Sequence, residues 1–482
     1  GEIVVTGDYV QNGALSLEGS LTGGDKITVL GDATINGAVN LELTEGYYPN
    51  GTNAVDLSKF IVAAGSIDYS AGYVLMPVIS STAVFPDYLN IVVNPDGTIT
   101  ATRDKAKFEA SVLAGIGTIA GKDVSSLVFA AKPVLGEAQN LIADLENGVV
   151  KYDDVGAVAN PKLHNTLTLS SIKRNQLISK FMSDKLIKDA ATGISKAGAD
   201  DIRNDENVFA FQFKSEAVQD SRTESAKYKS DAYGTIFGYE EFKNGWVGGL
   251  HFGFVKDDVK VSLTNDENSE TESEFIGFHW RKELKKGDRF MYGFARVGRE
   301  KSETARTAVL GAYGGNYNSD WKQHVKSLEV GYGKMNKSEK HSFIPVISLN
   351  YTKLDRPDIS ETFSAGNAFA LNFKRNDYNL LYANAGFAYN SLVSDKNNHK
   401  LDLGLSAVYS RSMLNKDHRS DWGMYGASVE NTWKTPARDG LDLAISFDYN
   451  TAYGFSAIVS YADTVLSEGF CNKRVNFELS QK

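Results

Sequence analysis

The feature that most constrains the fold is an alternation of apolar and polar residues that recurs from Asn207 to the end of the chain. In residues 233–254, YGTIFGYEEFKNGWVGGLHFGF, a large apolar side chain occupies most second positions, and glycine, histidine or glutamate is frequent between them. Side chains of a β-strand point alternately to two faces, so each strand has one large apolar face and one small or polar face. The pattern predicts that everything from Asn207 onward is strand.

The alternation occurs in twelve segments, and the connections between them alternate in length. The segments are residues 207–215, 231–242, 246–258, 273–284, 289–299, 325–336, 342–353, 379–391, 400–412, 422–433, 440–461 and 473–482. Short polar connections such as 243–245 and 435–440 alternate with long polar ones such as 258–272 and 354–376. Outer-membrane barrels have short periplasmic turns, long outer loops and an even number of strands. We therefore expect a twelve-stranded antiparallel transmembrane β-barrel rather than a sandwich.

In such a barrel the large apolar face meets lipid and the other face lines the lumen. The residues expected to face lipid are Tyr233, Phe237, Tyr239, Leu250, Phe252, Phe254, Phe278 and Trp280. The residues expected to line the lumen are Glu240, His251, Glu329, Asp402, Glu430, Asp442 and Asp448. Glycines on the inner face would leave room for a bulky occupant of the pore.

One strand does not fit this orientation. In residues 290–298, Arg296 falls on the same face as Phe290, Tyr292 and Phe294. Either the arginine extends to the lipid headgroups with its long side chain, or a β-bulge resets the alternation. In the first strand, Phe209, Phe211 and Phe213 share the apolar face, which we expect to be the outer one.

Composition narrows the class of protein. The chain has no run of eighteen apolar residues, which excludes a transmembrane helix but not a membrane barrel, whose mean hydropathy is low. A net charge of −9 argues against nucleic acid as a partner. Cys471 is the single cysteine, the seven histidines are scattered, and no metalloprotease, nucleophile-elbow or nucleotide-binding motif occurs. We expect no catalytic residues, no metal site and no cofactor.

The N-terminal part has a different character. Residues 1–103 are short strands separated by Gly, Asn and Asp turns, which favours the end of a β-solenoid, with an ordinary small β domain as the alternative. Residues 104–164 are a helical connector, in which a helical run over 106–148 has Asp123 or Ser125 as its possible N-cap.

A second helix is expected over residues 165–190, followed by a linker at 191–206 and the barrel at 207–482. The helix carries five basic residues and two acidic ones, a charge of +3. The basic residues are Lys173, Arg174, Lys180, Lys185 and Lys188. A twelve-stranded barrel is too wide for side chains alone to fill, and luminal carboxylates would attract this charge. We expect the helix to plug the pore; the alternative is a helix packed elsewhere with solvated charges.

The order of these parts resembles the classical monomeric autotransporters, the type Va secretion systems. Residues 5–47 are similar to the passenger-end autochaperone segment of pertactin-like members. The residues of its turn motif are Gly7, Asp8, Tyr9 and Gln11. Residues 167–186 are similar to the helix that precedes the barrel, and 233–254 to the second barrel hairpin.

The resemblance implies a translocator that inserts in the bacterial outer membrane with the help of the barrel-assembly machinery and periplasmic chaperones. It implies a monomer that exports its own N-terminal passenger and anchors it at the cell surface, and passenger folding outside would supply the energy. The paired asparagine of self-cleaving members is absent, since Asn160 and Asn165 are separated. An outer-membrane porin, and a soluble all-β binding protein or glycan-active enzyme, are the alternative functions.

Both ends of the chain depart from a complete member of that family. The start at Gly1, without a signal segment, predicts the C-terminal part of a longer precursor. Alternation runs unbroken over 441–461, so we expect strand eleven to extend above the membrane with 462–472 as the last loop; the alternative is a final strand at 453–463. The chain ends without the usual aromatic residue, so either one aromatic is missing or the assembly signal is degenerate.

Overall fold

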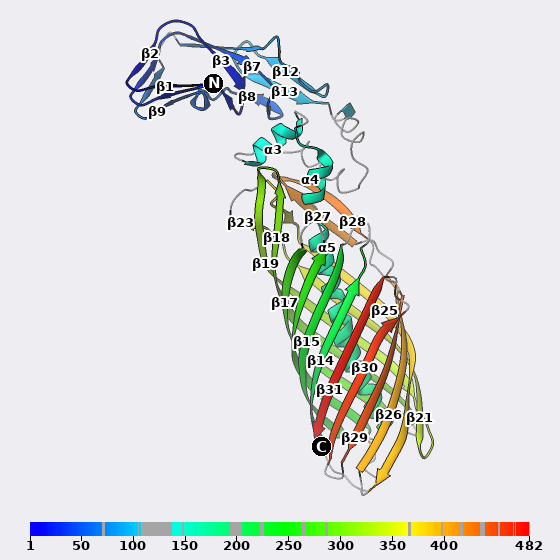
Figure 1. The fold of residues 1–482 in the computed structure, drawn as a ribbon. Helices are drawn as coiled ribbons and strands as arrows, with labels where there is room; N and C mark the ends of the chain where they lie inside the picture. The colour runs from blue at the N-terminus through cyan, green and yellow to red at the C-terminus, as the bar shows by residue number, and fades with distance from the viewer. Residues whose placement is uncertain are drawn as a thin grey trace.

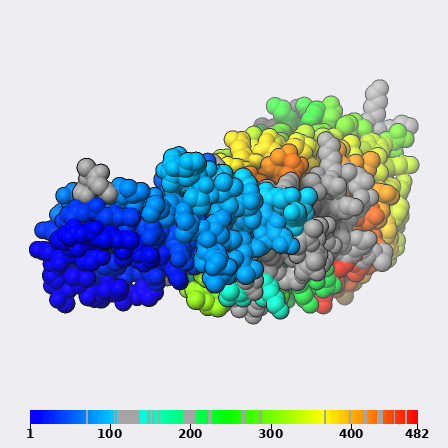
Figure 2. Space-filling model, turned by 90° about the horizontal axis from the view of Figure 1, so that it is seen from above, coloured from blue at the N-terminus to red at the C-terminus, as the bar shows by residue number. Residues whose placement is uncertain are grey.

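The structure is a computed structural model of the chain. It describes residues 1–69, 73–104, 106–107, 137–146, 149–159, 161–192, 205–221, 226–262, 266–284, 288–364, 368–396, 399–414, 418–433, 439–451, 454–465, 467 and 469–481. An N-terminal β domain lies across the upper end of a long barrel, and the C-terminus lies at the opposite end of the molecule (Figure 1). Viewed from above, the N-terminal domain projects to one side of the barrel (Figure 2).

The N-terminal domain consists of short parallel strands stacked in coils, the architecture of a β-solenoid. Its elements are β1 Glu2–Val5, β2 Tyr9–Gln11, β3 Leu15–Ser20, β4 Gly23–Gly24, β5 Lys26–Val29, β6 Ala33–Ile35, β7 Ala38–Leu43, β8 Gly51–Asn53, η1 Leu57–Lys59, β9 Ile61–Ala63, β10 Ile67–Tyr69, β11 Val74–Ile79, β12 Leu89–Val93 and β13 Ile99–Arg103. Strands of successive coils pair in parallel as β1-β5-β9, β2-β6-β10 and β3-β7-β11, and the antiparallel sheet β12-β13-β8 follows the last coil. Each coil buries aliphatic side chains, such as Ile35 and Leu41, against the coils beside it.

In the described part of the connection between this domain and the barrel, the helices are α3 Glu137–Glu146, α4 Tyr152–Val158 and α5 Lys162–Thr192. Helix α5 begins three residues before the expected start because Pro161, whose carbonyl accepts from Asn165 N, already belongs to its first turn. Most of the helical run expected over 106–148, with Asp123 and Ser125, lies outside the described residues. So does most of the linker expected at 191–206.

The barrel has twelve antiparallel strands, as the alternation predicts. They are β14 Asp205–Gln219, β15 Lys227–Lys243, β16 Trp246–Ser262, β17 Asp266–Glu283, β18 Arg289–Leu310, β19 Tyr313–Lys334, β21 His341–Arg356, β25 Asn376–Lys396, β26 His399–Ser412, β29 Asp439–Asn450, β30 Phe455–Val465 and β31 Phe470–Gln481. Pairing of β14 with β31 closes the sheet, in a register that runs from Val208–Gln481 to Gln219–Phe470. Because a closed barrel has no free edge, it satisfies the backbone inside lipid.

Two of the expected strand positions are wrong, although their number is right. Residues 422–433 lie outside the barrel, where β27 His418–Met424 and β28 Ala427–Trp433 form a hairpin. The apolar face of this hairpin packs on buried side chains at the barrel mouth, such as Phe369 and Phe373, so it alternates like a spanning strand. The segment 440–461 is two strands, β29 and β30, divided at Gly454, where φ is 78°. The last strand, β31, pairs with both neighbours, so the tail is not free.

The hairpin β27–β28 joins short strands in a four-stranded sheet of order β22-β24-β27-β28 beside the mouth. These strands are β22 Ile359–Ser360 and β24 Asn372–Phe373; two further short strands, β20 Asn336–Lys337 and β23 Thr362–Phe363, pair at the barrel ends. Helix α3 and the upper ends of β18 and β19 pack beside this sheet (Figure 1). We call this assembly the cap. Among the described residues, no helix is sufficiently long and apolar to cross a membrane.

Two strands face the opposite way from the expectation. Phe209 and Phe211 of β14, and Tyr292 and Phe294 of β18, are buried on the inner face. Arg296 lies on that inner face too, and β18 pairs with β19 without a register shift, so neither snorkelling to lipid nor a bulge explains its position. The inner face of these strands is aromatic because it packs against a helix rather than against water.

Candidate functional site

Helix α5 runs through the barrel lumen and packs against the inner faces of β15–β19, β21 and β25 (Figure 1). Its apolar side chains meet the wall in three clusters. In the first, Leu177, Ile178, Phe181 and Met182 meet Phe209 and its neighbours. The second and third clusters contain Leu169 and Ile172, and Leu186 and Ile187, respectively. The helix is therefore held along most of its length by apolar contacts that are removed from water.

At mid-height, Arg174 ties the helix to two strands. Its Nη1 lies 2.6 Å from Asp257 Oδ2 on β16, and its Nη2 lies 2.9 Å from Glu300 Oε2 on β18. The hydroxyl of Ser171 and the amide of Asn175 also donate to Glu300, at 2.5 and 2.7 Å. All three charged side chains are at most 2 % exposed. Removing one member of such a buried group leaves an uncompensated charge, which costs about 3–5 kcal/mol.

Neither Asp257 nor Glu300 was among the expected luminal residues. Asp257 has the same phase as His251 along β16, so the alternation already placed it inward. Glu300 lies one residue beyond the expected strand end at 299, on a strand whose orientation the alternation does not determine. The signal that could have identified both residues is the apolar–polar alternation, which continues along each strand above the membrane.

A second ionic group lies lower in the lumen around Lys185. Its ammonium group lies 2.5 Å from Asp189 Oδ2, one turn along the helix, and 3.0 Å from Glu240 Oε1 on β15. His279 Nε2 lies 2.9 Å from the same oxygen of Glu240. The ring of His279 in turn meets that of His251, with their Nδ1 atoms 3.1 Å apart. The expected residues Lys185, Glu240 and His251 are thus brought into one buried network.

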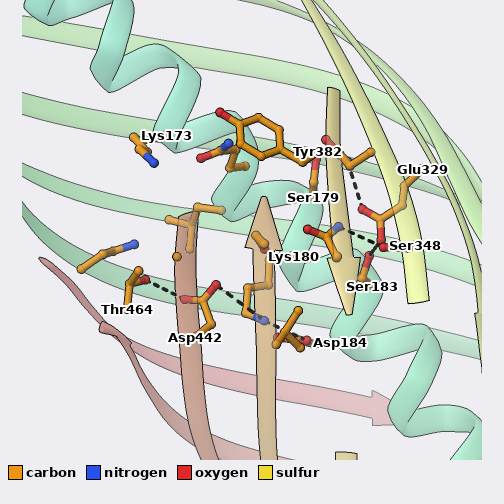
Figure 3. Close-up of a pocket in the computed structure, with 18 of the residues that line it drawn as sticks. Lys173, Ser179, Lys180, Ser183, Asp184, Glu329, Ser348, Tyr382, Asp442 and Thr464 are labelled. Atoms are coloured by element: carbon orange, nitrogen blue, oxygen red, sulfur yellow. Dashed lines mark hydrogen bonds and ion pairs between the residues drawn. The ribbon is translucent and has the colours of Figure 1, made fainter. Parts of the chain in front are cut away.

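Lys180 faces the opposite wall of the lumen. Its ammonium group lies 3.9 Å from Asp442 on β29 and 3.5 Å from Asp184 on the helix (Figure 3). Asp442 also accepts from Arg474 at 3.0 Å and from Thr464 at 2.6 Å. These residues line a cavity of about 120 Å³ between α5 and the wall. A second cavity of about 100 Å³ lies beside it.

The remaining basic residues of the helix, Lys188 and Lys173, also contact the wall. Lys188 lies 3.4 Å from Asp448. Asp402 of β26 pairs directly with Asp448 across the two strands, so both carboxylates share the inner face. The ammonium group of Lys173 lies 4.7 Å from the ring centre of Phe470.

Two of the carboxylates that were expected to meet basic residues of the helix have other partners. Glu329 is buried in the lumen, and it accepts from Ser183 at 2.6 Å and Asn350 at 2.9 Å. Glu430 does not line the lumen. It lies exposed on β28 in the cap and forms an ion pair of 3.1 Å with Arg419, because the segment that carries it is not a barrel strand.

The residues expected to face lipid lie on the outer wall. They are Tyr233, Phe237, Tyr239, Leu250, Phe252, Phe254 and Phe278, which are exposed, and Trp280, which is half-buried beside Trp246. The rings of Phe237 and Phe252 stack across β15 and β16 with centres 5.3 Å apart. An exposed apolar surface of this extent has a place against lipid tails.

The glycines of the inner wall serve a different purpose from the one expected. They do not chiefly leave room for the helix; many of them accommodate a ring from the neighbouring strand. A Cβ atom added at Gly238 would lie 2.0 Å from Phe209 Cζ, and one at Gly331 would lie 2.2 Å from Tyr292 Cζ. Gly249 receives the ring of His279 in the same way. The rings thus lie sideways over glycine and build a closely packed inner wall.

At the mouth, the start of α5 meets the cap through a third buried group. Glu361, between β22 and β23, binds Arg306 through both carboxylate oxygens, at 3.0 and 2.5 Å. His164 Nε2 lies 3.4 Å from Glu361 Oε1. Burial by itself would raise the pKa of Glu361, but the charge of Arg306 and the hydrogen bonds from His164 and Arg306 lower it to about 2. The top of the helix is therefore fixed to a carboxylate that stays ionised.

The motif expected to act as an autochaperone connects two coils of the solenoid. Asp8 Oδ1 accepts from Asp32 N at 2.9 Å, and Tyr9 N donates to Asp32 O at 2.8 Å. Gln11 Oε1 accepts from Gly37 N at 3.1 Å. Gly7 lies in the turn just before β2. The whole motif therefore lies on the first coil, where that coil stacks against the second.

An apolar outer wall, a closed antiparallel sheet and a lumen filled by a helix of the same chain define a β-barrel translocator of the outer membrane. The autotransporter beta-domain family model matches residues 208–462, more than half of the chain. The chain belongs to the autotransporter family. It is a type V secretion translocator located in the outer membrane, and its cargo is its own passenger; this favours the expected function over a porin or a soluble protein.

Several solved structures are similar to this chain to differing degrees. The translocator domain of the autotransporter NalP from Neisseria meningitidis is 14 % identical, with a TM-score of 0.51, covering 68 % of this chain and 99 % of that one. The beta domain of the Bordetella autotransporter BrkA is 13 % identical with a TM-score of 0.42, covering 57 % and 99 %. The transport unit of AIDA-I from Escherichia coli is 8 % identical with a TM-score of 0.39, covering 62 % and 97 %. No curated protein matches the chain. Within the described part of the chain, no group of three or more metal-binding side chains is arranged around an ion site.

Proposed function

We propose that α5 is a plug that closes the pore once the passenger is outside, and that Arg174 and Lys185, which are buried among carboxylates of the wall, determine where it docks. The observation that carries this proposal is the buried group of Arg174, Asp257 and Glu300. Its two carboxylates come from β16 and β18, and the Lys185 group adds Glu240 from β15. Such a set of partners exists only in the formed barrel, so the helix docks after the wall is complete.

We propose that the apolar residues of the outer wall, from Tyr233 to Trp280, contact lipid.

We also propose that this chain has the protein partners that the family resemblance implies. The barrel closes by pairing its first strand, β14, with its last, β31, which are separated by more than two hundred residues. Contacts of such large sequence separation form slowly, and unpaired strand edges are prone to aggregation. We therefore propose that the barrel-assembly machinery and periplasmic chaperones act on this chain, which then functions as a monomer.

We propose that the Asp8 and Gln11 contacts start the folding of the passenger outside the cell. They join the first coil to the second through side-chain bonds to backbone groups. A stack of coils grows from a formed neighbour, so a coil that is already joined offers a template for the next one. This function concerns transport; the activity of any passenger is a separate matter.

The plug is tested by the conductance of the purified barrel in planar bilayers. Arg174→Gln leaves Asp257 and Glu300 buried without their cation, so the docked state should lose about 3–5 kcal/mol. We expect the fraction of time in the open, high-conductance state to rise by two to three orders of magnitude. Lys173→Gln removes the same charge one residue away, outside the ionic group, and is the matched control.

A compensating variant separates docking from folding. In Arg174→Gln combined with Asp257→Asn and Glu300→Gln, the charges are absent but the shapes are kept, so much of the closed state should return. The proposal is wrong if Arg174→Gln conducts like the unmodified barrel. A permanently open unmodified barrel would also contradict it.

A further inference from the structure

We propose that three arginines of the inner wall attract the acidic side chains of the exported N-terminal segment, residues 1–103, while that segment passes through the barrel. The three residues are Arg281 on β17, Arg296 on β18 and Arg356 on β21. We call them the arginine column. They differ from the other charged residues of the lumen because, among the described residues, none of the three has a carboxylate partner when α5 is docked.

In the docked state the arginine column contacts α5 through uncharged oxygen atoms. Arg281 Nη1 donates to the carbonyl of Leu186 at 3.2 Å, and Arg356 Nη1 donates to a threonine hydroxyl of the helix at 3.1 Å. Arg296 Nη2 donates to the side-chain oxygen of Asn175 at 3.0 Å. All three arginines are at most 3 % exposed. Each also has a guanidinium nitrogen without a partner in the part of the chain that the structure describes.

Buried cations of this kind are costly, because burial removes their hydration and no opposite charge replaces it. The helix cannot supply the opposite charge. Its two acidic residues, Asp184 and Asp189, lie 3.5 and 2.5 Å from Lys180 and Lys185 of the same helix. The arginine column is therefore explained by another occupant of the lumen, one that carries carboxylates.

The exported segment of this chain has the required charge. Residues 1–103 contain eleven acidic residues and three basic ones, a net charge of −8, whereas the whole chain carries −9. Nearly all of the net negative charge thus lies in the part that is exported. Before α5 docks, the wall carboxylates that it later covers, such as Asp257 and Glu300, repel this segment. The arginine column offsets that repulsion on one side of the lumen.

The spacing of the arginine column suits a chain that passes along it. Arg281 pairs with Tyr292 of β18, so it lies four residues below Arg296 along the wall. Through the pairing of β19 with its two neighbours, Arg356 lies at the level of Glu300, four residues above Arg296. Four residues of a strand span about 13 Å. An extended segment with an acidic residue in about every nine positions therefore has a carboxylate beside the column at most stages of its passage.

This inference rests on the proposed function, because it requires the exported segment to pass through the lumen that α5 later fills. Different measurements test the two. The plug is measured as the conductance of the purified barrel, and the arginine column as the rate of export in cells. A barrel that fails the conductance test but exports more slowly without the arginines would refute the plug and support the column.

The test uses the full chain, directed to the periplasm of a Gram-negative host by a signal peptide. A pulse-chase experiment follows barrel folding by heat-modifiable migration, and export by antibody labelling of an N-terminal epitope on intact cells. In Arg281→Gln/Arg296→Gln/Arg356→Gln we expect the half-time of export from folded barrels to rise about tenfold. Arg281→Lys/Arg296→Lys/Arg356→Lys keeps the charges and should export at the unmodified rate.

A second arm halves the net charge of the exported segment, to −4. It neutralises four acidic side chains that make no hydrogen bond or ion pair with the described residues. The substitutions are Glu18→Gln, Glu42→Gln, Asp68→Asn and Asp87→Asn. With this segment, loss of the three arginines should slow export only about threefold, because half of the attracting charge is gone.

The matched control neutralises four exposed acidic side chains of the barrel instead, and should leave the tenfold effect unchanged. Its substitutions are Asp258→Asn, Glu272→Gln, Asp320→Asn and Glu339→Gln.

The inference fails if the glutamine variant exports at the unmodified rate once its barrel has folded, or if the lysine variant exports as slowly as the glutamine variant. It also fails if loss of the arginines slows the neutralised segment as much as the native one, since that result would show a role in the barrel alone. Should the triple glutamine variant form no heat-modifiable barrel, the three single variants decide, each expected to slow export about twofold.

Discussion

Single residues of the inner wall determine how closely neighbouring strands can pack. Gly331 and Gly238 face aromatic rings of the adjacent strand at distances that leave no room for a Cβ atom. The rings in turn form the surface on which α5 lies, as with Tyr292 beside Ile187. A glycine of this wall therefore acts on the plug indirectly, through the ring that it accommodates.

We predict that Gly331→Ala destabilises the barrel by about 1–3 kcal/mol, the usual cost of overpacking a well-packed site. The new Cβ would lie 2.2 Å from Cζ of Tyr292, whose buried ring packs in one cluster with Leu186 and Ile187 of α5 and would have to shift. Gly248→Ala is the control, since its Cβ would have its nearest neighbours at 3.9 Å. Urea unfolding followed by heat-modifiable migration on gels measures both. Equal stability of the two variants would contradict the account of the inner wall.

At the residue scale the sequence predicts some features of the site better than others. Alternation places Glu240, His251 and Asp442 inward because polar side chains are tolerated on one face only. It misplaces Phe209 and Tyr292, because an aromatic residue satisfies a helix-packed lumen as well as it satisfies lipid. The five basic residues of α5 can be identified from the sequence. Their partners cannot, because the partners depend on the rotation and height of the helix in the barrel.

At the scale of elements, α5 is held at three heights by charge and along its length by apolar contacts. The uppermost of these attachments joins it to the cap through Glu361, Arg306 and His164. The hairpin β27–β28 belongs to this cap, and the sequence could not separate it from a barrel strand, since apolar and polar residues alternate in both. What distinguishes them is the partner of the apolar face, which is a protein core in one case and lipid in the other.

We predict that the attachment of α5 to the cap weakens in acid. The pKa of Glu361 is lowered to about 2 in the folded protein from an ordinary value of 4.5. A carboxyl group with a lowered pKa contributes stability that is fully present above pH 4.5 and is lost as the pH falls through about 2. The shift corresponds to a contribution on the order of 3 kcal/mol.

Hydrogen exchange of peptides covering residues 359–373 should therefore accelerate between pH 4.5 and 2, after correction for the intrinsic pH dependence. Glu361→Gln should exchange faster at pH 6 and show little further change in that window. A pH-independent exchange rate in the unmodified chain would show that the carboxylate does not fix the cap.

At the scale of the whole molecule, two bodies of different construction meet at the cap. The solenoid is stabilised by contacts between adjacent coils, and the barrel by a closed ring of strands around a helix. The sequence indicates this division through composition, since helix-forming residues separate the two β regions. It does not indicate that the mouth of the barrel is covered by a hydrophobic core, because the residues involved come from distant segments such as 137–146 and 418–433.

We predict that the two bodies unfold separately. Leu41 is fully buried in the solenoid, so Leu41→Ala should destabilise that domain by about 2–5 kcal/mol. Circular dichroism should show that the thermal unfolding transition of the solenoid moves to a lower temperature. The heat-modifiable transition of the barrel should keep its temperature, and a shift of both transitions together would show that they form one cooperative unit.

The connection between β15 and β16 has a consequence for the wall as a whole. Asn244 and Gly245 both have positive φ angles, 50° and 74°, the geometry of a two-residue turn whose twist matches the strands it joins. That turn pairs Lys243 with Trp246 and so sets every pairing above it. A slip of one residue would exchange the two faces of one strand, which would put Glu240 into lipid and Phe237 into the lumen. Two residues outside the lumen thus define what is inside and what is outside along this hairpin.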